Sequence, residues 1–153
     1  MQKLIVSTVR NAGGEGQKLT NKFSTGVVDL LLKLPHATPE QATAHTLLME
    51  VKQVQYVDPA IPRWFKLDLT TPQKTFLAKW DRAGTPACVG SFVQDGTGIG
   101  GLWFAVYSLS HCKEHDWLGS TVDHERLGDA KGRNDKIPLL IRRFLGDWRF
   151  KDD

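Results

Sequence analysis

Blocks of apolar and polar positions along the chain predict an alternation of short helices and strands. In residues 2–12 apolar side chains recur at helical spacing until a pair of glycines stops them, which predicts a short helix. Residues 15–20 could form a first strand. The run from 26 to 34 is apolar almost throughout, as expected for a strand buried on both faces, and residues 45–54 form a second run of β type.

The second half of the chain predicts a helix, two strands and a final helix. Residues 70–84 combine a threonine cap, a proline in the first turn and a terminal glycine, and Trp80 is expected in the core on the apolar face of this helix. Strands are predicted at 87–93 and 102–109, joined by a glycine-rich turn, and an amphipathic helix is predicted at 136–149. The connecting stretches 55–68 and 111–134 are predicted to be irregular.

The order of these elements, α-β-β-β-α-β-β-α, predicts an α/β fold with a mixed β-sheet and helices on both faces. The length favours a single domain over 1–153. Hydrophobic residues make up 41% and charged residues 24%, a balance that excludes a disordered tail or a fibrous repeat. Because the sequence shows no membrane span, signal-peptide pattern or disulfide framework, we expect a soluble cytoplasmic protein.

Two acidic residues interrupt apolar strands. Asp29 lies within VVDLLL and Glu50 within LLMEVK, and a buried carboxylate is costly unless a partner or a metal compensates it. If the two strands form an antiparallel hairpin that residues 35–44 close symmetrically, Asp29 faces Glu50 on one side of the sheet. Two carboxylates at that spacing repel each other unless a cation lies between them or one of them takes a proton.

A lysine completes this candidate site. Lys52 shares a face with Glu50, because side chains alternate along a strand with a period of two. Oxygen ligands suit a hard divalent ion such as Mg²⁺ or Mn²⁺, and a lysine beside such an ion can orient or help to deprotonate an attacking water. The alternative is that Lys52 is simply the ion-pair partner of Glu50.

The combination of these residues resembles a known family. Gly26-Val-Val-Asp29, followed roughly twenty residues later by Glu50-Val-Lys52, resembles the signature of PD-(D/E)xK nucleases. The first helix ending in Gly-Gly and the segment Thr-Thr-Pro-Gln73 are similar to the VRR-NUC branch, which includes small stand-alone phage nucleases. The resemblance covers about residues 2–93, leaves about 110–153 as a C-terminal extension, and implies a restriction-endonuclease-like core.

The resemblance also implies roles for single residues. Asp29 and Glu50 would bind Mg²⁺ or Mn²⁺, with the Val51 carbonyl as a further ligand. Lys52 would be the catalytic lysine. Two supporting positions are Gln73, which matches a helix glutamine near the site, and Lys18, which matches a basic residue on the first strand.

The activity implied by the resemblance is a metal-dependent endonuclease that cuts branched, flapped or Holliday-junction DNA as a homodimer. Two positions depart from the family pattern. Val28 stands where the family has a proline before the aspartate, and Gln2 is the only polar candidate where a first-helix glutamate often assists metal binding. A catalytically inactive nuclease fold that binds DNA or a partner protein is therefore the alternative.

Basic residues supply candidate DNA contacts in two segments. The net charge is only +3, but residues 126–151 hold eight basic residues against three aspartates, a patch that attracts a polyanion if it is not simply a solvated helix face. The expected contacts there are Arg133, Lys136, Arg142 and Arg143. In the 55–68 stretch Arg63, Trp64 and Lys66 interleave cations with aromatic rings, which suits base stacking unless the segment is a hydrophobic plug over the sheet.

Two further patterns are weaker. Residues 96–101 match G-x-G-x-x-G, but a predicted strand follows them where a nucleotide site needs a helix, so a hairpin turn is favoured. A zinc-stabilised binding protein is a second alternative, although the spacing lacks two short ligand pairs. Its ligands would come from His111, Cys112 and His115 with Cys88 or His124.

Overall fold

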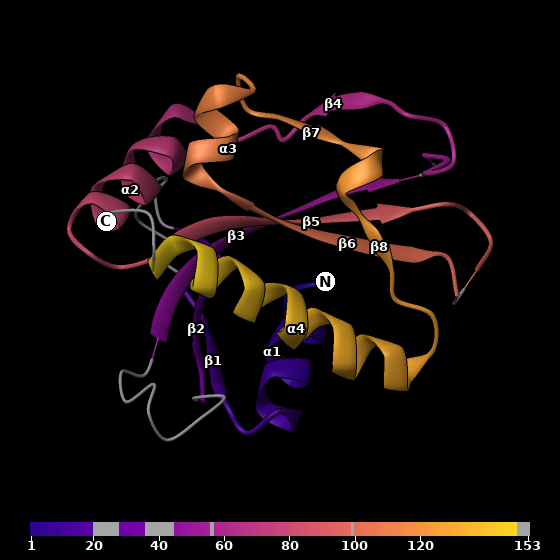
Figure 1. Cartoon of the computed structure of the whole chain (residues 1–153), viewed down its shortest axis with the longest axis horizontal. Helices are drawn as coiled ribbons and strands as arrows, with labels where there is room; N and C mark the ends of the chain where they lie inside the picture. Colours follow the sequence, from indigo (N-terminus) through magenta and orange to yellow (C-terminus); the bar gives the residue numbers. More distant parts are fainter. Residues whose placement is uncertain (20–27, 36–44, 56, 99, 150–153) are drawn as a thin grey trace.

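A mixed sheet of six strands runs through the computed structural model, which describes residues 1–19, 28–35, 45–55, 57–98 and 100–149 (Figure 1). Its order is β1-β2-β3-β5-β6-β8, and β3 with β5 is the parallel pair in an otherwise antiparallel sheet. The strands are β1 (Glu15–Lys18), β2 (Leu30–Leu34), β3 (His45–Gln55), β5 (Ala87–Gln94), β6 (Leu102–Ser108) and β8 (Glu125–Arg126).

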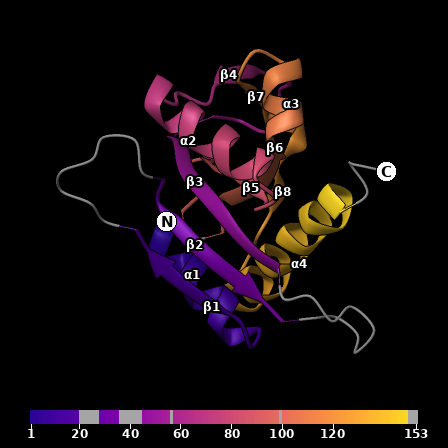
Figure 2. The same ribbon diagram turned by 90° about the vertical axis from the view of Figure 1, so that its left-hand side faces the viewer.

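Helices cover both faces of this sheet (Figure 2). One layer contains α1 (Gln2–Asn11) and α4 (Ala130–Arg149), and the other contains α2 (Thr71–Arg82) and α3 (Leu109–Glu114). A small second sheet pairs β4 with β7 on the side of α2 and α3. Its elements are β4 (Trp64–Lys66) and β7 (Leu118–Ser120), which the 3-10 turn η1 (Thr121–Asp123) follows.

The alternation of side chains along β3 decides which face carries polar chemistry. Leu47 and Met49 are buried against the α1 and α4 layer, whereas Leu48 is buried against the α2 and α3 layer. Side chains in a strand alternate between the two faces, so Glu50 points toward α2. The fold therefore buries a carboxylate on the α2 side at the centre of the sheet.

The capping of α2 follows the predicted sequence signals. The Thr70 hydroxyl accepts a hydrogen bond from the Gln73 amide at 3.3 Å, and the Gln73 side chain accepts one from the Thr70 amide at 3.0 Å. This reciprocal capping box satisfies two of the free donors at the start of the helix. It also fixes the Gln73 side chain beside β3.

The mixed α/β architecture with helices on both faces is confirmed, and so is the antiparallel register of β2 and β3, in which Leu30 pairs with Met49. The predicted hairpin turn is confirmed as well, since β5 and β6 are antiparallel partners on either side of it. Asp95 holds this turn by accepting bonds from the Thr97 amide at 2.9 Å and the Trp103 indole at 3.0 Å.

Several boundaries predicted from the sequence are wrong. The stretch 111–134, expected to be irregular, contains most of α3 together with β7, η1, β8 and the start of α4, and the stretch 55–68 contains β4. These elements are too short to show a hydrophobic period. The last helix begins at Ala130 rather than at 136, because its first turns are polar and carry no apolar stripe. Trp80 is 43% exposed rather than in the core, where Leu77 alone of α2 is fully buried.

Within the described residues, no helix combines the length and the apolar character that crossing a membrane requires.

The tight join between α1 and β1 leads to a stability prediction. A Cβ at Gly14 would meet the Lys33 carbonyl oxygen and would lie 2.9 Å from a Val9 methyl group. We expect Gly14→Ala to lower the free energy of unfolding by roughly 1–3 kcal/mol through overpacking. Gly146→Ala in α4, where a Cβ meets nothing within 4 Å, should instead raise it by up to about 1 kcal/mol through helix propensity. Urea denaturation measures both, and a Gly14→Ala protein as stable as wild type would contradict the close approach.

Candidate active site

Asp29 lies at the entrance to β2 and contacts the neighbouring strand β3. The sequence placed Asp29 inside a strand, but β2 begins at Leu30, so Asp29 precedes it; residues 26–27 lie outside the described part of the chain. The Asp29 Oδ2 atom accepts a hydrogen bond from the Val51 amide at 2.9 Å. The predicted pairing thus brings Asp29 next to the segment that carries Glu50, although not as a strand residue.

Glu50 is the buried carboxylate of the site, with a side chain only 3% exposed. Its Oε1 atom accepts a hydrogen bond from the Gln73 side chain at 3.2 Å and lies 3.9 Å from the Lys52 Nζ. Its Oε2 atom is buried and finds no donor among the residues that the structure describes. A buried oxygen without a donor costs free energy unless a proton or a cation satisfies it.

The protonation of Glu50 reflects this environment. The pKa of Glu50 is raised from 4.5 to about 8, first by burial and then by the Asp29 carboxyl through a hydrogen bond and its charge. The Lys52 ammonium acts in the opposite direction. At neutral pH Glu50 therefore holds a proton when no cation is bound.

A cavity of about 370 Å³ opens where the start of α1 approaches β1 and β3, and it is lined by Val51 and Lys52, which follow Glu50 in β3. It contains Lys52, which is 24% exposed, together with Val51 and the Lys18 of β1. Gln2, at the position discussed for a first-helix ligand, lines the same cavity. The neighbouring Lys3 also lines it, and nothing in the sequence had singled that residue out.

These residues fit a divalent metal ion through oxygen donors. The unsatisfied Glu50 Oε2 and the adjacent Asp29 carboxyl form an acidic pair that a hard cation would neutralise. The N–H and C=O groups of one strand residue point to the same side, so the Val51 carbonyl lies on the side of Asp29, which its amide contacts. No group of three or more His, Cys, Asp or Glu side chains that could hold a metal occurs among the described residues. A bound ion would therefore depend on this pair, the backbone carbonyl and water.

The proposed zinc ligands do not form a site of this kind. His111 and His115 have ring centroids 4.3 Å apart, but His124 is used elsewhere, with its ring nitrogens 2.9 Å from Ser120 and Ser91 oxygens. Burial lowers the pKa of His124 to about 4, so this side chain is neutral near pH 7. These histidines belong to the packing around α3 and β7.

The predicted DNA contacts in the 55–68 stretch are exposed side chains of β4 and its approach. Arg63 and Lys66 are exposed, and Trp64 is 56% exposed and stacks on His115 with ring centroids 5.5 Å apart. Phe65 points inward and packs against the core. The segment thus buries the Phe65 ring and exposes the side chains on either side of it. The role of Arg63, Trp64 and Lys66 in DNA binding stays a prediction.

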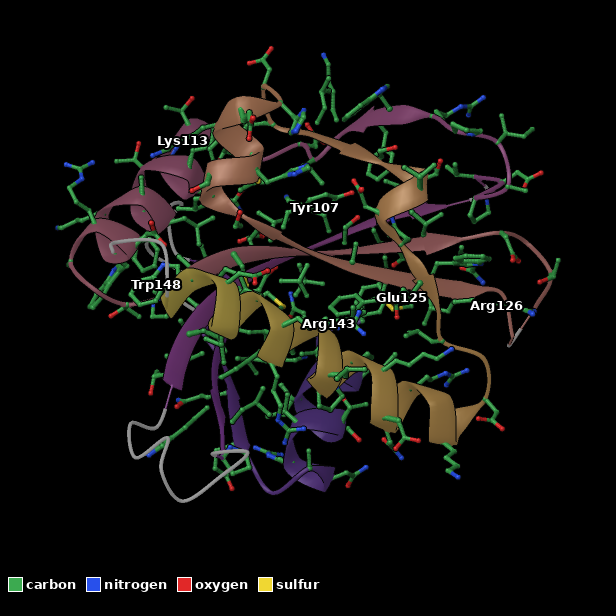
Figure 3. The ribbon with its side chains drawn as sticks, viewed as in Figure 1. Tyr107, Lys113, Glu125, Arg126, Arg143 and Trp148 are labelled. Carbon is green, nitrogen blue, oxygen red and sulfur yellow. The ribbon has the colours of Figure 1, made fainter. Side chains whose placement is uncertain are left out.

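The basic residues of α4 lie in the layer on the opposite face of the sheet from Glu50. Arg143 donates to Glu125 of β8 at 3.1 Å (Figure 3), and the Lys136 Nζ donates to the Arg126 carbonyl at 2.6 Å. Both contacts tie the helix to the edge of the sheet. Arg133 and Arg142 of the same helix are partly buried, and the DNA-binding role of this set stays a prediction.

The raised pKa of Glu50 predicts an unusual dependence of stability on pH. In metal-free buffer the free energy of unfolding should fall by roughly 1–2 kcal/mol from pH 6.5 to 8, because folded Glu50 still holds a proton that the unfolded chain has lost. His124 acts in the opposite sense, because its pKa moves from 6.5 down to about 4, but its titration in the unfolded chain is nearly complete by about pH 7.5, so it offsets only a small part of the fall.

Glu50→Gln removes the titrating group with little change in shape, so this variant should lose that slope. Urea denaturation at several pH values measures it. Equal slopes in wild type and Glu50→Gln would show that Glu50 titrates normally.

Comparison with known proteins gives limited similarity. No family model and no curated protein matches the chain. Among solved structures, the chain is similar to Hjc, a Holliday junction resolvase from the archaeal hyperthermophile Archaeoglobus fulgidus. The match covers 72% of this chain and 76% of that chain, with 15% sequence identity and a TM-score of 0.43. At that level of similarity, we base the functional proposal on the geometry of the chain's own residues.

Proposed function

We propose that the chain is a metal-dependent nuclease that hydrolyses phosphodiester bonds in DNA. The observation that carries the proposal is the buried Glu50 carboxyl, whose Oε2 has no donor in the described structure and whose neighbour is the Asp29 carboxyl. A purely structural acid at this place would be satisfied by donors of the chain. An acid that is left unsatisfied beside a second acid is suited to holding a cation.

The proposed division of labour follows from the contacts. Asp29, Glu50 and the Val51 carbonyl would hold Mg²⁺ or Mn²⁺, which would acidify a water and stabilise negative charge on the phosphate. The Lys52 Nζ lies 3.9 Å from Glu50 Oε1 and lines the open cavity, where it can hold and orient a water against the phosphorus. Lys18 lines the same cavity and adds positive charge for the phosphate.

Gln73 acts as a positioning residue in this scheme. Its amide nitrogen binds Glu50 Oε1, and its amide oxygen is held by the capping box of α2. Because both ends of the Gln73 amide are engaged, this side chain holds Glu50 by its Oε1 atom and leaves the Oε2 atom without a bond to Gln73. The start of α2 thereby orients the carboxylate for a ligand.

The finer parts of the proposal come from the resemblance to VRR-NUC nucleases of small phage type. They are a structure-selective action on Holliday junctions, flaps or other branched DNA, a homodimeric state, and a single nuclease domain over 1–153. One observation favours a second candidate: the cavity holds the amide of Gln2 where a further carboxylate would assist metal binding. That candidate is an inactive nuclease fold that binds DNA without cutting it.

Cleavage assays test the proposed roles. Asp29→Asn, Glu50→Gln and Lys52→Met should each lower the rate of DNA cleavage by roughly a hundredfold or more in Mg²⁺ or Mn²⁺, because each removes a group that acts on the phosphate or holds the ion. Glu114→Gln, at an exposed acid of α3, is the matched control and should cleave as wild type does. The substrates are duplex, single-stranded, flap and four-way-junction DNA.

The outcomes separate the two candidates. A Lys52→Met protein with unchanged turnover would eliminate the assigned lysine. Binding of these substrates with no cleavage of any of them, in either metal, would favour the inactive module over the enzyme.

Stability measurements test the ion separately from turnover. A divalent ion that binds only the folded chain stabilises it by about 2.7 kcal/mol at a hundredfold excess over Kd. We therefore expect Mn²⁺ to raise the Tm of wild type and of Glu114→Gln, and to raise that of Asp29→Asn much less. Equal shifts in all three proteins would place the ion away from Asp29.

A further inference from the structure

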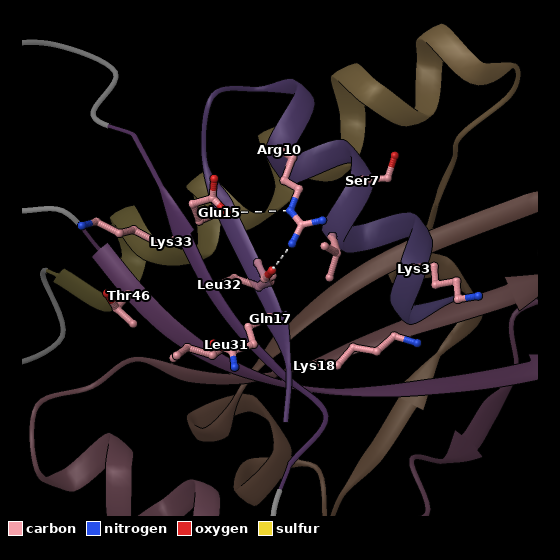
Figure 4. Close-up of a pocket in the computed structure, with 12 residues that line it drawn as sticks. Lys3, Ser7, Arg10, Glu15, Gln17, Lys18, Leu31, Leu32, Lys33 and Thr46 are labelled. Atoms are coloured by element: carbon pink, nitrogen blue, oxygen red, sulfur yellow. Dashed lines mark hydrogen bonds and ion pairs between the residues drawn. The ribbon is translucent and has the colours of Figure 1, made fainter. Parts of the chain in front are cut away.

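A groove rich in basic residues lies along α1, β1 and β2 (Figure 4). The cavity that contains Lys52 shares Lys3 and Lys18 with a larger cavity of about 680 Å³. That second cavity continues past Arg10 to Lys33. Because the two cavities have two residues in common, they form one concave path with Lys52 at one end and Lys33 at the other.

The charge of this path is strongly one-sided. Its lining holds five cationic residues and one acidic residue, Glu15. Glu15 lies 3.8 Å from the Arg10 guanidinium, which also donates to the Gly16 carbonyl at 3.0 Å. The charge of Glu15 is therefore already paired with that of Arg10 in the lining of the groove. The cations are Lys3, Arg10, Lys18, Lys33 and Lys52.

The strand register sets the length of the path. Lys18 pairs with Leu30 at the end of β1 near the site, and Glu15 pairs with Lys33 at the far end. Three steps along a strand cover roughly 10 Å, which is about the axial rise of three nucleotides in one DNA strand. Cations at the two ends of such a span can contact phosphates about three nucleotides apart on a single backbone.

We propose that this groove binds the phosphate backbone of the DNA strand that enters the site, guiding it past Lys3 and Lys18 toward Lys52. The direction of the path rests on the nuclease function proposed above, whereas the binding of DNA by the groove does not. Besides its cations and Glu15, the larger cavity is lined by apolar residues and by only three polar side chains that could contact base edges, Ser7, Gln17 and Thr46. The groove therefore holds DNA by charge and without sequence preference.

The cations of α4 differ from those of the groove in their contacts and in their place on the sheet. Two of its cations, Arg143 and Lys136, are engaged by Glu125 and by the Arg126 carbonyl at the opposite edge of the sheet. The groove cations come instead from α1, β1, β2 and β3, toward the β1 edge of the sheet, and the cavities that they line reach Lys52 of the candidate site.

The test measures DNA affinity over a salt series in buffer that contains EDTA, with a short fluorescein-labelled duplex as the probe. The test variant combines Lys3→Gln with Lys33→Gln, two exposed groove residues outside the proposed catalytic set. The control combines Lys113→Gln with Lys131→Gln, which removes the same charge from exposed positions of α3 and α4.

We expect the groove variant to bind more weakly and its plot of log affinity against log salt to flatten by about 1.8, because about 0.9 of a counterion is released per duplex phosphate contact. The control should keep the wild-type slope. A groove variant with the wild-type slope, or a control that flattens equally, overturns the proposal. Because EDTA prevents metal-dependent cleavage, this measurement tests DNA binding by the groove whether or not the cleavage assays support a nuclease.

Discussion

The repulsion between the Glu50 carboxyl on the central strand β3 and the Asp29 carboxyl at the entrance to β2 is the constraint on which the rest of the site depends. Asp29 is tied to the Val51 amide and Glu50 is enclosed against α2, so neither group can turn out to solvent without breaking a bond that the fold provides. The raised pKa of Glu50 expresses the cost of this enclosure. A cation in the same place would relieve the repulsion and satisfy the free oxygen together.

The architecture supplies this constraint through a small number of elements. β3 is bordered by β2 on one side and by β5 on the other, which buries its middle and leaves its polar face against the start of α2. The capping box makes the first turn of α2 rigid, and Gln73 serves the cap and Glu50 at once. The stability of the helix and the orientation of the carboxylate are therefore coupled through one side chain.

Much of this arrangement is predictable from the sequence because it is local or depends on strand pairing. The apolar runs define β2 and β3, the antiparallel pairing of these strands brings Asp29 near Glu50, and the threonine cap locates α2. The groove could not be predicted, because Lys3 comes from α1, Lys18 from β1 and Lys33 from β2, and no pattern in the sequence connects them. The short elements β4, β7 and β8 were missed because two or three residues show no periodicity; tertiary pairing alone creates them.

The most direct measurement of the central claim is the number of protons released when Mn²⁺ binds, obtained by calorimetry in buffers of different ionisation enthalpy. If the ion replaces the proton on Glu50, wild type should release about one proton per ion at pH 7 and progressively less above pH 8, where Glu50 is already ionised. Binding without proton release at pH 7 would contradict the claim, because it would mean either that Glu50 is ionised before the ion arrives or that the ion binds elsewhere.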